Sequence, residues 1–369
     1  MTAGTAANAP PIERVSTAVY SFPTPEPEAD GTLSWSATTA VTVTLEAAGR
    51  TGLGWTYSSP AAAAVINHHL ATEVHEHDAF DIPGGWEAMR RACRNLGTKG
   101  LVMQAISAVD IAWWDLKARI LGIALADLFG QCRSDVPIYG SGGFTTLTGT
   151  QLDEQLAWWR SVGATSMKIK IGESWGEHVE RDLDRVRQVR ESAGASVEVM
   201  VDANGAYTVA QASRIGAALD DLGVTWFEEP VSSDDPAGLR RLREELRCDV
   251  AAGEYAADLY EVRALLPAVD CMQLDVTRCG GYTGWLRAAA LADAHNLQVS
   301  GHCAPALHAH VGTAVPNLRH VEWFVDHARL EPELVDGSPD VHDGALHPDL
   351  GRLGHGMCLS RHAENRRTG

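Results

Sequence analysis

The chain has 369 residues, enough for one large domain or two unequal ones, because a single hydrophobic core stops growing at roughly 250 to 300 residues. Apolar residues make up 45% and charged residues 21%, which is typical of a folded globular protein and not of a disordered chain. The formal net charge of -18 disfavours nucleic acid and anionic membrane surfaces as partners, because both favour a basic face.

The seven cysteines are scattered and form no CxxC pair, and an odd number suits a reduced protein better than a disulfide framework. The N-terminal sequence MTAGTAANAPP has no basic segment followed by an apolar run. No segment approaches the roughly 18 apolar residues of a membrane span. We therefore expect a cytoplasmic protein.

Residues 1–134 predict an α+β capping domain. Strand-like, turn-rich sequence runs from about 12 to 57 and includes a proline- and acid-rich loop, TPEPEADGTLSW, at 24–35. Helical periodicity follows from about 60 to 130. No group of residues in this part resembles a catalytic cluster.

Residues 135–327 alternate between short β-rich runs and helical stretches. The eight runs are VPIYGSG, SMKIKIG, SVEVMVDA, VTWFEEP, DVAAGE, CMQLDV, LQVSGHC and RHVEWF. Eight strands separated by helices predict a (β/α)8 barrel, because parallel neighbours need a crossover connection. The tail, 328–369, is rich in Gly, Pro, His and Asp, and we expect it to pack back on the capping domain.

Three equally spaced acids end successive predicted strands: Asp202, Glu228 and Glu254. Strand ends at this face of a barrel hold active sites, which disfavours the alternative of three unrelated exposed acids. Crowded carboxylates raise one another's pKa unless a cation lies between them. Oxygen ligands favour Mg²⁺ over Zn²⁺, so the sequence predicts a magnesium site.

Lys168 and Lys170 are two of only four lysines among 30 basic residues. Strand periodicity sends both side chains to one face, and that face is the barrel interior because Met167, Ile169 and Ile171 must pack against helices. Close ammonium groups near a metal depress each other's pKa, which makes a lysine a base near neutral pH. The alternative is a pair of surface lysines at a fraying strand end.

Asp275 and His302 end the sixth and seventh predicted strands. Neighbouring strands let the carboxylate accept a hydrogen bond from the imidazole, which fixes the tautomer and strengthens the base. Glu322 ends the eighth strand and is either a protonated donor to a substrate oxygen, which we favour, or a capping acid.

Other polar residues near these strand ends have open roles. Asn204 either orients Asp202 or touches substrate, or it only forms an Asn-Gly turn. Arg278 either holds a second anionic group or is a plain loop cation. Cys279 and Cys303 lie near the expected site, but no motif around them indicates a nucleophile.

Taken together, these motifs resemble the mandelate racemase subgroup of the enolase superfamily over nearly the whole chain. They are KIK at 168–170, VDANGAY around Asp202, TWFEEP around Glu228, GE at 253–254, LD followed by CGGYTGW, and the strand-end His302. Relatives that act as muconate cycloisomerases or dipeptide epimerases carry a lysine on the sixth strand, where this chain has Asp275 and Arg278. That departure points away from them.

The resemblance implies a role for each residue. One Mg²⁺ per subunit would bind Asp202, Glu228 and Glu254. The catalytic residues would be Lys170 as the base on one face, Lys168 tuning it and contacting the substrate carboxylate, His302 with Asp275 on the opposite face, and Glu322 hydrogen-bonding the carboxylate. Cap loops near 22–36 and 52–58, with Trp35 and Tyr57, would contact the substrate, and the protein would be a homo-oligomer, from dimer to octamer.

The expected activity is abstraction of the proton next to a carboxylate. Dehydration of an acid sugar, an aldonate or aldarate, to a 2-keto-3-deoxy acid is favoured, and racemisation or epimerisation of a 2-hydroxy acid is the alternative. The acidic cap loop offers no cation for a distal carboxylate, which favours a monoacid. A Schiff-base lyase using Lys170 and a noncatalytic sugar-binding protein fit the two opposed bases less well.

Overall fold

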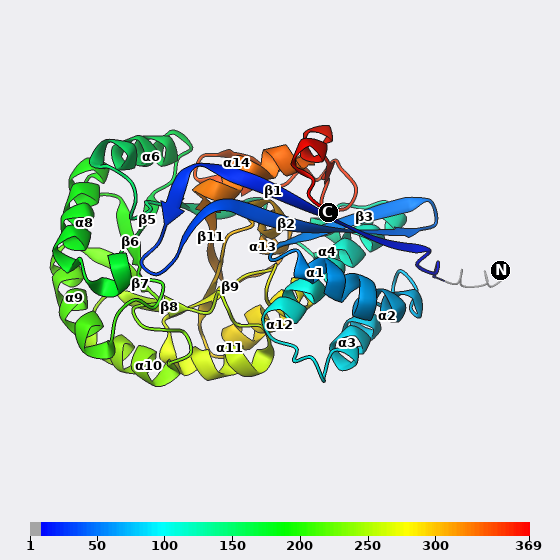
Figure 1. Cartoon of the computed structure of the whole chain (residues 1–369), viewed down its shortest axis with the longest axis horizontal. Helices are drawn as coiled ribbons and strands as arrows, with labels where there is room; N and C mark the ends of the chain where they lie inside the picture. The colour runs from blue at the N-terminus through cyan, green and yellow to red at the C-terminus, as the bar shows by residue number, and fades with distance from the viewer. Residues whose placement is uncertain (1–8) are drawn as a thin grey trace.

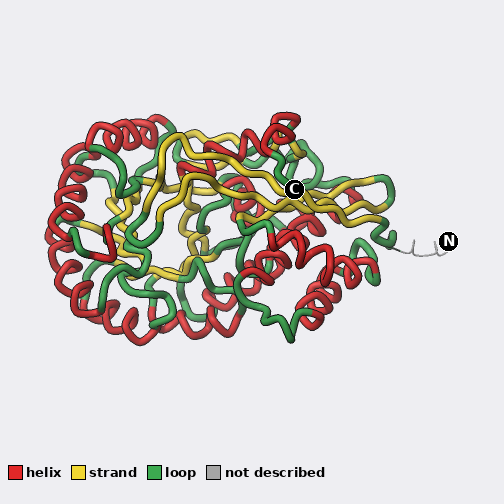
Figure 2. The backbone as a smooth tube through the Cα atoms, in the orientation of Figure 1, coloured by secondary structure: helices red, strands yellow, loops and turns green. Residues whose placement is uncertain are grey.

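The computed structural model describes residues 9–369, which form a barrel with a smaller capping unit beside it and across its mouth (Figure 1). A ring of helices surrounds the barrel strands (Figure 2). Within the described range, no helix is both long and apolar enough to cross a bilayer. All seven cysteines are free thiols.

The capping unit is a three-stranded antiparallel sheet backed by helices. Its strands, in spatial order, are β1 (Arg14–Ala29), β2 (Ser34–Ala47) and β3 (Arg50–Tyr57). Its helices are α1 (Ala61–Val65), the π-helical turn η1 (Ile66–Leu70), α2 (Ala71–His75), α3 (Ile82–Ala92), α4 (Leu101–Leu121) and α5 (Leu125–Phe129). The α+β prediction for this part is confirmed.

The proline- and acid-rich segment differs from the expected loop. Strand β1 continues to Ala29 with an irregularity between Pro23 and Glu28, and only residues 30–33 form the turn. The strand tolerates prolines because β1 lies at the edge of its sheet, where a missing N–H breaks no ladder. Asp30 closes the turn by accepting hydrogen bonds from the backbone of Thr32 and Leu33 at 2.6 and 2.7 Å.

Helix α4 packs closely on β3 because β3 carries glycines where the two meet. A Cβ on Gly54 would lie 2.3 Å from the carbonyl oxygen of Ala108, and one on Gly52 would lie 2.2 Å from that of Ala112. The close approach lets α4 bury nearly all of one face, and it fixes the cap strands over the barrel.

The barrel contains the eight strands that the sequence predicts. They are β4 (Val136–Gly142), β5 (Ser166–Lys170), β6 (Glu198–Asp202), β7 (Val224–Glu228), β8 (Asp249–Ala252), β9 (Cys271–Leu274), β10 (Gln298–Gly301) and β11 (Leu318–Phe324). All pair in parallel with their sequence neighbours, and β11 closes the barrel on β4 with Val321 opposite Ile138. The predicted fold class is confirmed.

Helices connect and cover the strands. They are α6 (Gly149–Ser161), the short α7 (Glu173–Gly176), α8 (Val179–Ala193), α9 (Val209–Asp221), α10 (Pro236–Glu245), α11 (Leu259–Leu265) with the 3₁₀ turn η2 (Leu266–Ala268), α12 (Gly281–Asp293), α13 (Pro305–Gly312) and α14 (Val325–Leu334). The expected boundary at residue 327 falls inside α14, so the last helix of the barrel extends beyond it.

The two faces of the barrel strands belong to two different apolar clusters, one between strands and helices and one inside the barrel. Met167 and Ile169 of β5 belong to the large apolar cluster between strands and helices, as their alternation with the lysines predicts. A small cluster fills the barrel interior: Tyr139, Met200, Trp226, Ala251 and Cys271. Lys168 and Lys170 share this inner face and are buried.

The C-terminal tail contacts both units. The strands β13 (Asp340–His342) and β14 (Ala345–His347) form a hairpin that pairs with β4, a contact with the barrel that was not expected. β12 (Val335–Asp336) pairs with β15 (Cys358–Leu359), and the 3₁₀ helix η3 (Arg361–Arg366) follows. On the cap, His355 bonds the carbonyl oxygen of Leu53 at 2.7 Å, and Thr368 bonds Val19 at 2.8 Å.

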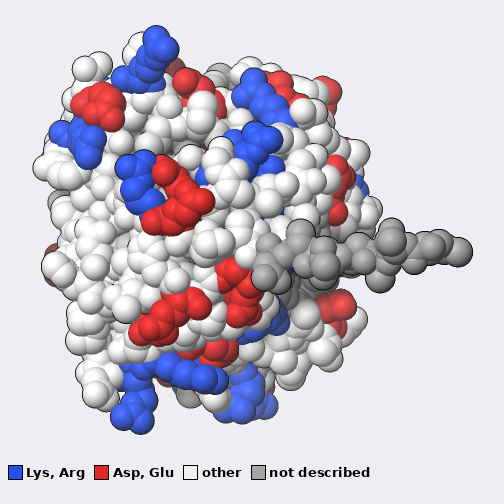
Figure 3. Space-filling view, turned by 90° about the vertical axis from the view of Figure 1, so that its right-hand side faces the viewer, with Lys and Arg blue, Asp and Glu red and all other residues white. Residues whose placement is uncertain are grey.

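Acidic and basic side chains are interspersed on the face drawn in Figure 3, although the chain is strongly acidic overall. No continuous basic patch covers that face.

Candidate active site

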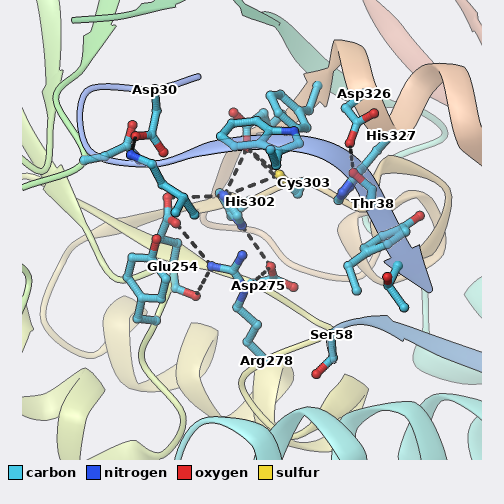
Figure 4. A pocket seen from close by; sticks show the side chains of 18 of the residues that line it. Asp30, Thr38, Ser58, Glu254, Asp275, Arg278, His302, Cys303, Asp326 and His327 are labelled. Carbon is cyan, nitrogen blue, oxygen red and sulfur yellow. Dashed lines mark hydrogen bonds and ion pairs between the residues drawn. The ribbon is translucent and has the colours of Figure 1, made fainter. Parts of the chain in front are cut away.

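A pocket of about 360 Å³ opens where the cap covers the carboxyl ends of the barrel strands (Figure 4). The turn between β1 and β2 reaches the barrel loops, because the backbone of Ala29 bonds Thr145 and that of Gly31 bonds Trp175. Most of the residues predicted from the sequence line this pocket: Trp35, Tyr57, Lys170, Asn204, Glu254, Asp275, Arg278, His302 and Glu322. Lys168, Asp202 and Glu228 are not among the lining residues and are fully buried.

Asp202, Glu228 and Glu254 converge as predicted. One oxygen from each lies within 4.8 Å of the others, and all three side chains are buried. Burial and the nearby Asp202 raise the pKa of Glu228 to about 8. Oε2 of Glu254 is buried and receives no hydrogen bond. An oxygen-only donor set with an unsatisfied oxygen and mutual repulsion fits a hard divalent cation such as Mg²⁺.

A fourth acid, Glu229, also lies beside this cluster. It is buried, its Oε1 receives no hydrogen bond, and its backbone φ is +38°. Burial and the charge of Glu254 raise the pKa of Glu229 well above its ordinary value. Glu229 was not predicted as a site residue, although the doubled acid in TWFEEP indicates it.

The lysines neutralise part of the acidic cluster. Nζ of Lys168 lies 2.5 Å from Glu228 and 2.9 Å from Glu322, and Lys170 forms an ion pair with Asp202. Burial alone would lower the pKa of Lys170, but Asp202 outweighs burial and holds the pKa above its ordinary value.

The expectation of lysines with lowered pKa values is therefore wrong for the protein residues alone. Lys168 does lower the pKa of Lys170, as predicted, but Asp202 acts more strongly in the opposite direction. Each ammonium group is in direct contact with a carboxylate, and this contact stabilises the charged form of the lysine. A divalent cation on these carboxylates would compete with the lysines for the same negative charge.

His302 and Asp275 form the predicted pair. Nδ1 of His302 lies 2.8 Å from Oδ2 of Asp275, while Thr277 donates its backbone N–H and its hydroxyl to the other oxygen, each at 2.7 Å. Burial would lower the pKa of His302, but Glu254, Glu322 and Asp275 together raise it. Nε2 of His302 faces the pocket side of the pair, 3.2 Å from Oε2 of Glu254.

Glu322 is not the protonated donor that the sequence suggested. Burial would raise its pKa, but Lys168 and His302 hold the pKa well below its ordinary value. The ionised carboxylate accepts hydrogen bonds from Oγ of Ser141 at 2.5 Å and from the backbone N–H of Cys303 at 2.9 Å.

Arg278 is held by acids of the site itself. Its guanidinium lies 3.2 Å from Glu254 and 3.3 Å from Asp275, and it stacks over the ring of Tyr255. Arg278 is therefore not a plain loop cation, and its role in holding a second anionic group remains a prediction.

The remaining predicted contacts are placed as follows. The backbone N–H of Asn204 bonds Asp202 at 2.8 Å, and its buried Oδ1 receives no hydrogen bond. Trp35 lines the pocket and donates from Nε1 to Glu28 at 2.9 Å. Tyr57 also lines it, but its hydroxyl donates to Glu331. The hydroxyl of Tyr57 is therefore occupied, and its ring stacks on that of His327 with the centroids 3.8 Å apart.

Several residues that support the site were not predicted from the sequence. Gln273 and Trp226 donate to Oε2 of Glu228 at 2.7 and 2.9 Å, and they point into the barrel because they alternate with outward apolar residues. Strand alternation could have identified them. The cap end of the pocket includes Thr38 and Asp326, which are hydrogen-bonded to each other across a long sequence separation that no local pattern reveals.

Two family models match the chain. Residues 15–130 match the mandelate racemase/muconate lactonizing enzyme N-terminal domain, and residues 151–363 match the enolase C-terminal domain-like family. Together they cover the cap and nearly the whole barrel.

Three relatives illustrate the range of similarity. A 3,6-anhydro-α-L-galactonate cycloisomerase from Streptomyces coelicolor is 34% identical over 94% of this chain and 97% of its own length. The L-talarate/galactarate dehydratase from Salmonella typhimurium is 32% identical over 85% of this chain and 78% of its own. Its crystal structure with Mg and L-lyxarohydroxamate gives a TM-score of 0.91, covering 100% of this chain and 96% of that one.

The third relative is known by its structure. A mandelate racemase/muconate lactonizing enzyme-like protein from Rubrobacter xylanophilus is 45% identical, with a TM-score of 0.94, covering 97% of this chain and 100% of that chain.

Proposed function

Because this chain belongs to the mandelate racemase/muconate lactonizing enzyme family of the enolase superfamily, we propose that it is a magnesium-dependent dehydratase of acid sugars. The observation that carries the proposal is the His302–Asp275 pair, which faces the same pocket as Lys170. His302 follows β10 and Lys170 ends β5, three strand positions apart around the eight-stranded barrel. Two proton-transfer groups on different sides of a ligand suit removal of a proton and loss of a neighbouring hydroxyl.

Enzymes of this superfamily use Mg²⁺, and Asp202, Glu228 and Glu254 are the residues proposed to hold it. Bound there, the ion supplies positive charge against the charge that develops on the substrate carboxylate as its α-proton leaves. Gln273 and Trp226 keep Glu228 oriented, so the donor set needs little rearrangement.

Lys170 is proposed to remove the α-proton. Lys170 lines the pocket. Lys168 is not among the lining residues, and its positive charge is paired with Glu322. The positive charge of Lys168 lowers the pKa of Lys170. Once a cation binds Asp202 and offsets its negative charge, this effect would help Lys170 to lose its proton.

His302 is proposed to complete the elimination. Nε2 donates a proton to the β-hydroxyl, the C–O bond breaks, and water leaves, while Asp275 stabilises the histidine in its charged form. The enol that remains takes up a proton at C3 and becomes a 2-keto-3-deoxy acid. The α-proton resides on Lys170 until solvent removes it.

The cap end of the pocket favours a substrate with a neutral, hydroxylated tail. The lining residues at this end include Asp30, Thr38, Ser58 and Asp326, and no lysine or arginine among the described lining residues belongs to the cap. Arg329 lies outside the lining and already pairs with Asp326, so a second carboxylate would meet the charge of Asp30 with no lining cation from the cap to offset it. A monoacid is therefore the favoured substrate.

Ring opening of an anhydro sugar acid is a second candidate. The cycloisomerase from Streptomyces coelicolor is similar over 94% of this chain. An ether oxygen on the β-carbon would accept the proton of His302 as a hydroxyl does, but the leaving oxygen would stay in the molecule.

A substrate screen tests the proposal. The purified protein with Mg²⁺ is incubated with mono- and diacid sugars and their anhydro forms, and 2-keto acid is detected with semicarbazide before and after EDTA. A metal-dependent signal, stronger with monoacids, is expected. Exchange of the α-proton in D₂O without any 2-keto acid would replace the proposal with a racemase. No product and no exchange with any acid would overturn both.

A further inference from the structure

A second cluster of metal-binding side chains lies beside the carboxylates proposed to hold Mg²⁺. His302 and Cys303 follow β10 and are labelled in Figure 4. Glu322 is on β11, and all three residues are buried and line the pocket. Sγ of Cys303 lies 3.4 Å from Nε2 of His302 and 3.3 Å from Oε2 of Glu322, and the latter two atoms are 3.6 Å apart. The dehydration mechanism gives Cys303 no role.

These separations match one face of a zinc coordination tetrahedron. Zinc bonds of about 2.0–2.1 Å to nitrogen or oxygen and about 2.3 Å to sulfur place neighbouring ligand atoms roughly 3.3 to 3.6 Å apart. The three ligand atoms therefore need little movement to bind one ion. Sulfur and imidazole nitrogen favour Zn²⁺ and similar soft ions over Mg²⁺, which prefers oxygen alone.

A fourth ligand is available from the neighbouring cluster. Oε2 of Glu254 is buried, receives no hydrogen bond, and lies 3.2 Å from Nε2 of His302. This oxygen can therefore serve as a ligand to an ion bound at Nε2 of His302. Because Glu254 is also a proposed magnesium ligand, the two ions would share or compete for it.

The surroundings already orient the ligands. Asp275 bonds Nδ1 of His302 and holds a proton on that nitrogen, so Nε2 is the ring atom presented to the cluster. Ser141 and the backbone N–H of Cys303 fix both oxygens of Glu322. A carboxylate behind the metal-facing histidine is the arrangement found around protein zinc ions.

We propose that His302, Cys303 and Glu322 form an inhibitory site for a thiophilic divalent cation such as Zn²⁺. Binding forms bonds from the ion to Nε2, Sγ and Oε2, and two protons pass to solvent: the thiol proton of Cys303 and, where His302 is charged, the proton on Nε2. The ion occupies the lone pair with which His302 would exchange protons, so proton transfer on that side of the pocket stops. The inhibitory consequence rests on the proposed function, but the binding site does not.

Cobalt substitution tests the site directly. Cys132 and Cys358 are exposed thiols, so they are first replaced in a Cys132→Ser, Cys358→Ser background. With Mg²⁺ in excess, Co²⁺ is expected to produce a thiolate-to-cobalt charge-transfer band at one ion per chain, and Zn²⁺ is expected to remove it. Cys303→Ser should abolish the band and weaken zinc binding more than about 100-fold, since losing outer partners alone costs 10- to 100-fold. Cys279→Ser, a matched buried thiol, should retain the band.

A band that survives Cys303→Ser, or no band in the background protein, would overturn the proposal. If Cys303→Ser fails to fold by circular dichroism, alkylation of the unaltered chain decides. Zn²⁺, and not Mg²⁺, should protect Cys303 from iodoacetamide in peptide mass spectra, and unprotected Cys303 would contradict the site. These readouts need no substrate, so failure of the dehydratase proposal leaves them interpretable. Where activity is found, micromolar Zn²⁺ should inhibit it in the presence of millimolar Mg²⁺.

Discussion

Asp275 and His302 stand at the ends of neighbouring parallel strands, and Oδ2 of Asp275 lies 2.8 Å from Nδ1 of His302. Thr277 saturates the other oxygen of Asp275, so the carboxylate has one orientation. The histidine is thereby presented to the pocket through Nε2 in a fixed tautomer.

Replacing Asp275 with asparagine should lower kcat by about 10²- to 10⁴-fold, the range of general acid–base contributions. Asparagine retains the shape but loses the charge that stabilises protonated His302. The pKa of His302 read from the pH profile of kcat should also fall, because Asp275 contributes to its elevation. Mg²⁺ affinity should change little, and a variant that loses only metal affinity would contradict the role of Asp275.

Mg²⁺ should stabilise the fold. Burial and the charge of Asp202 raise the pKa of Glu228, and a bound cation offsets that charge. At 100 times its dissociation constant the ion should add about 2.7 kcal/mol to the free energy of unfolding. Thermal unfolding with Mg²⁺ or EDTA measures this. Glu228→Gln should abolish the Mg²⁺-dependent shift, while Glu191→Gln, on the surface, should retain it. Equal shifts in both variants would place the ion elsewhere.

Glu331 should make stability fall as pH rises. Burial raises its pKa from about 4.5 to about 8, so between these values the folded chain holds a proton that the unfolded chain has released. The free energy of unfolding therefore decreases across this window for this group. Glutamine at position 331 does not titrate, so Glu331→Gln lacks this pH-dependent loss of stability. The free energy of unfolding of the variant minus that of the parent chain should therefore increase from about pH 4.5 to about pH 8. Denaturant unfolding at a series of pH values measures the difference.

Tyr57→Phe is the control for this experiment. It removes the hydrogen bond to Glu331 but leaves the buried carboxyl, so it should retain the pH dependence of the parent chain. A pH-independent difference between Glu331→Gln and the parent would show that Glu331 is ionised in the folded protein.

Gly54→Ala should destabilise the cap by about 1–3 kcal/mol, because the new Cβ would lie 2.3 Å from the carbonyl oxygen of Ala108 in α4. Urea unfolding measures the loss. Gly149→Ala is the control, since its Cβ meets only the flexible amide of Gln188 at 3.2 Å. Equal stability of the two variants would contradict the close packing of β3 on α4.

The sequence predicted the fold and the site most accurately where one periodicity applied. Alternation along β5 placed Lys168 and Lys170 inside the barrel, and strand ends brought Asp202 and Glu228 to one edge. The structure differs from the prediction where contacts between residues far apart in the sequence determine the protonation state of a side chain. The pKa of Lys170 depends on its contact with Asp202, and the state of Glu322 depends on Lys168.

Other differences have similar causes. The prolines of β1 indicated a loop, but an edge strand accommodates them. The hairpin of the tail pairs with β4, which composition alone does not specify. The domain limits, the cytoplasmic location and the homo-oligomer remain predictions.

Proton exchange in D₂O tests the central claim most directly, using a substrate found in the screen with wild type, Lys170→Ala and His302→Asn. We predict that wild type forms 2-keto acid, that Lys170→Ala neither exchanges the α-proton nor forms product, and that His302→Asn exchanges the proton without forming product. If Lys170→Ala exchanged the proton at the wild-type rate, or His302→Asn formed product at that rate, the proposed division of roles would be contradicted.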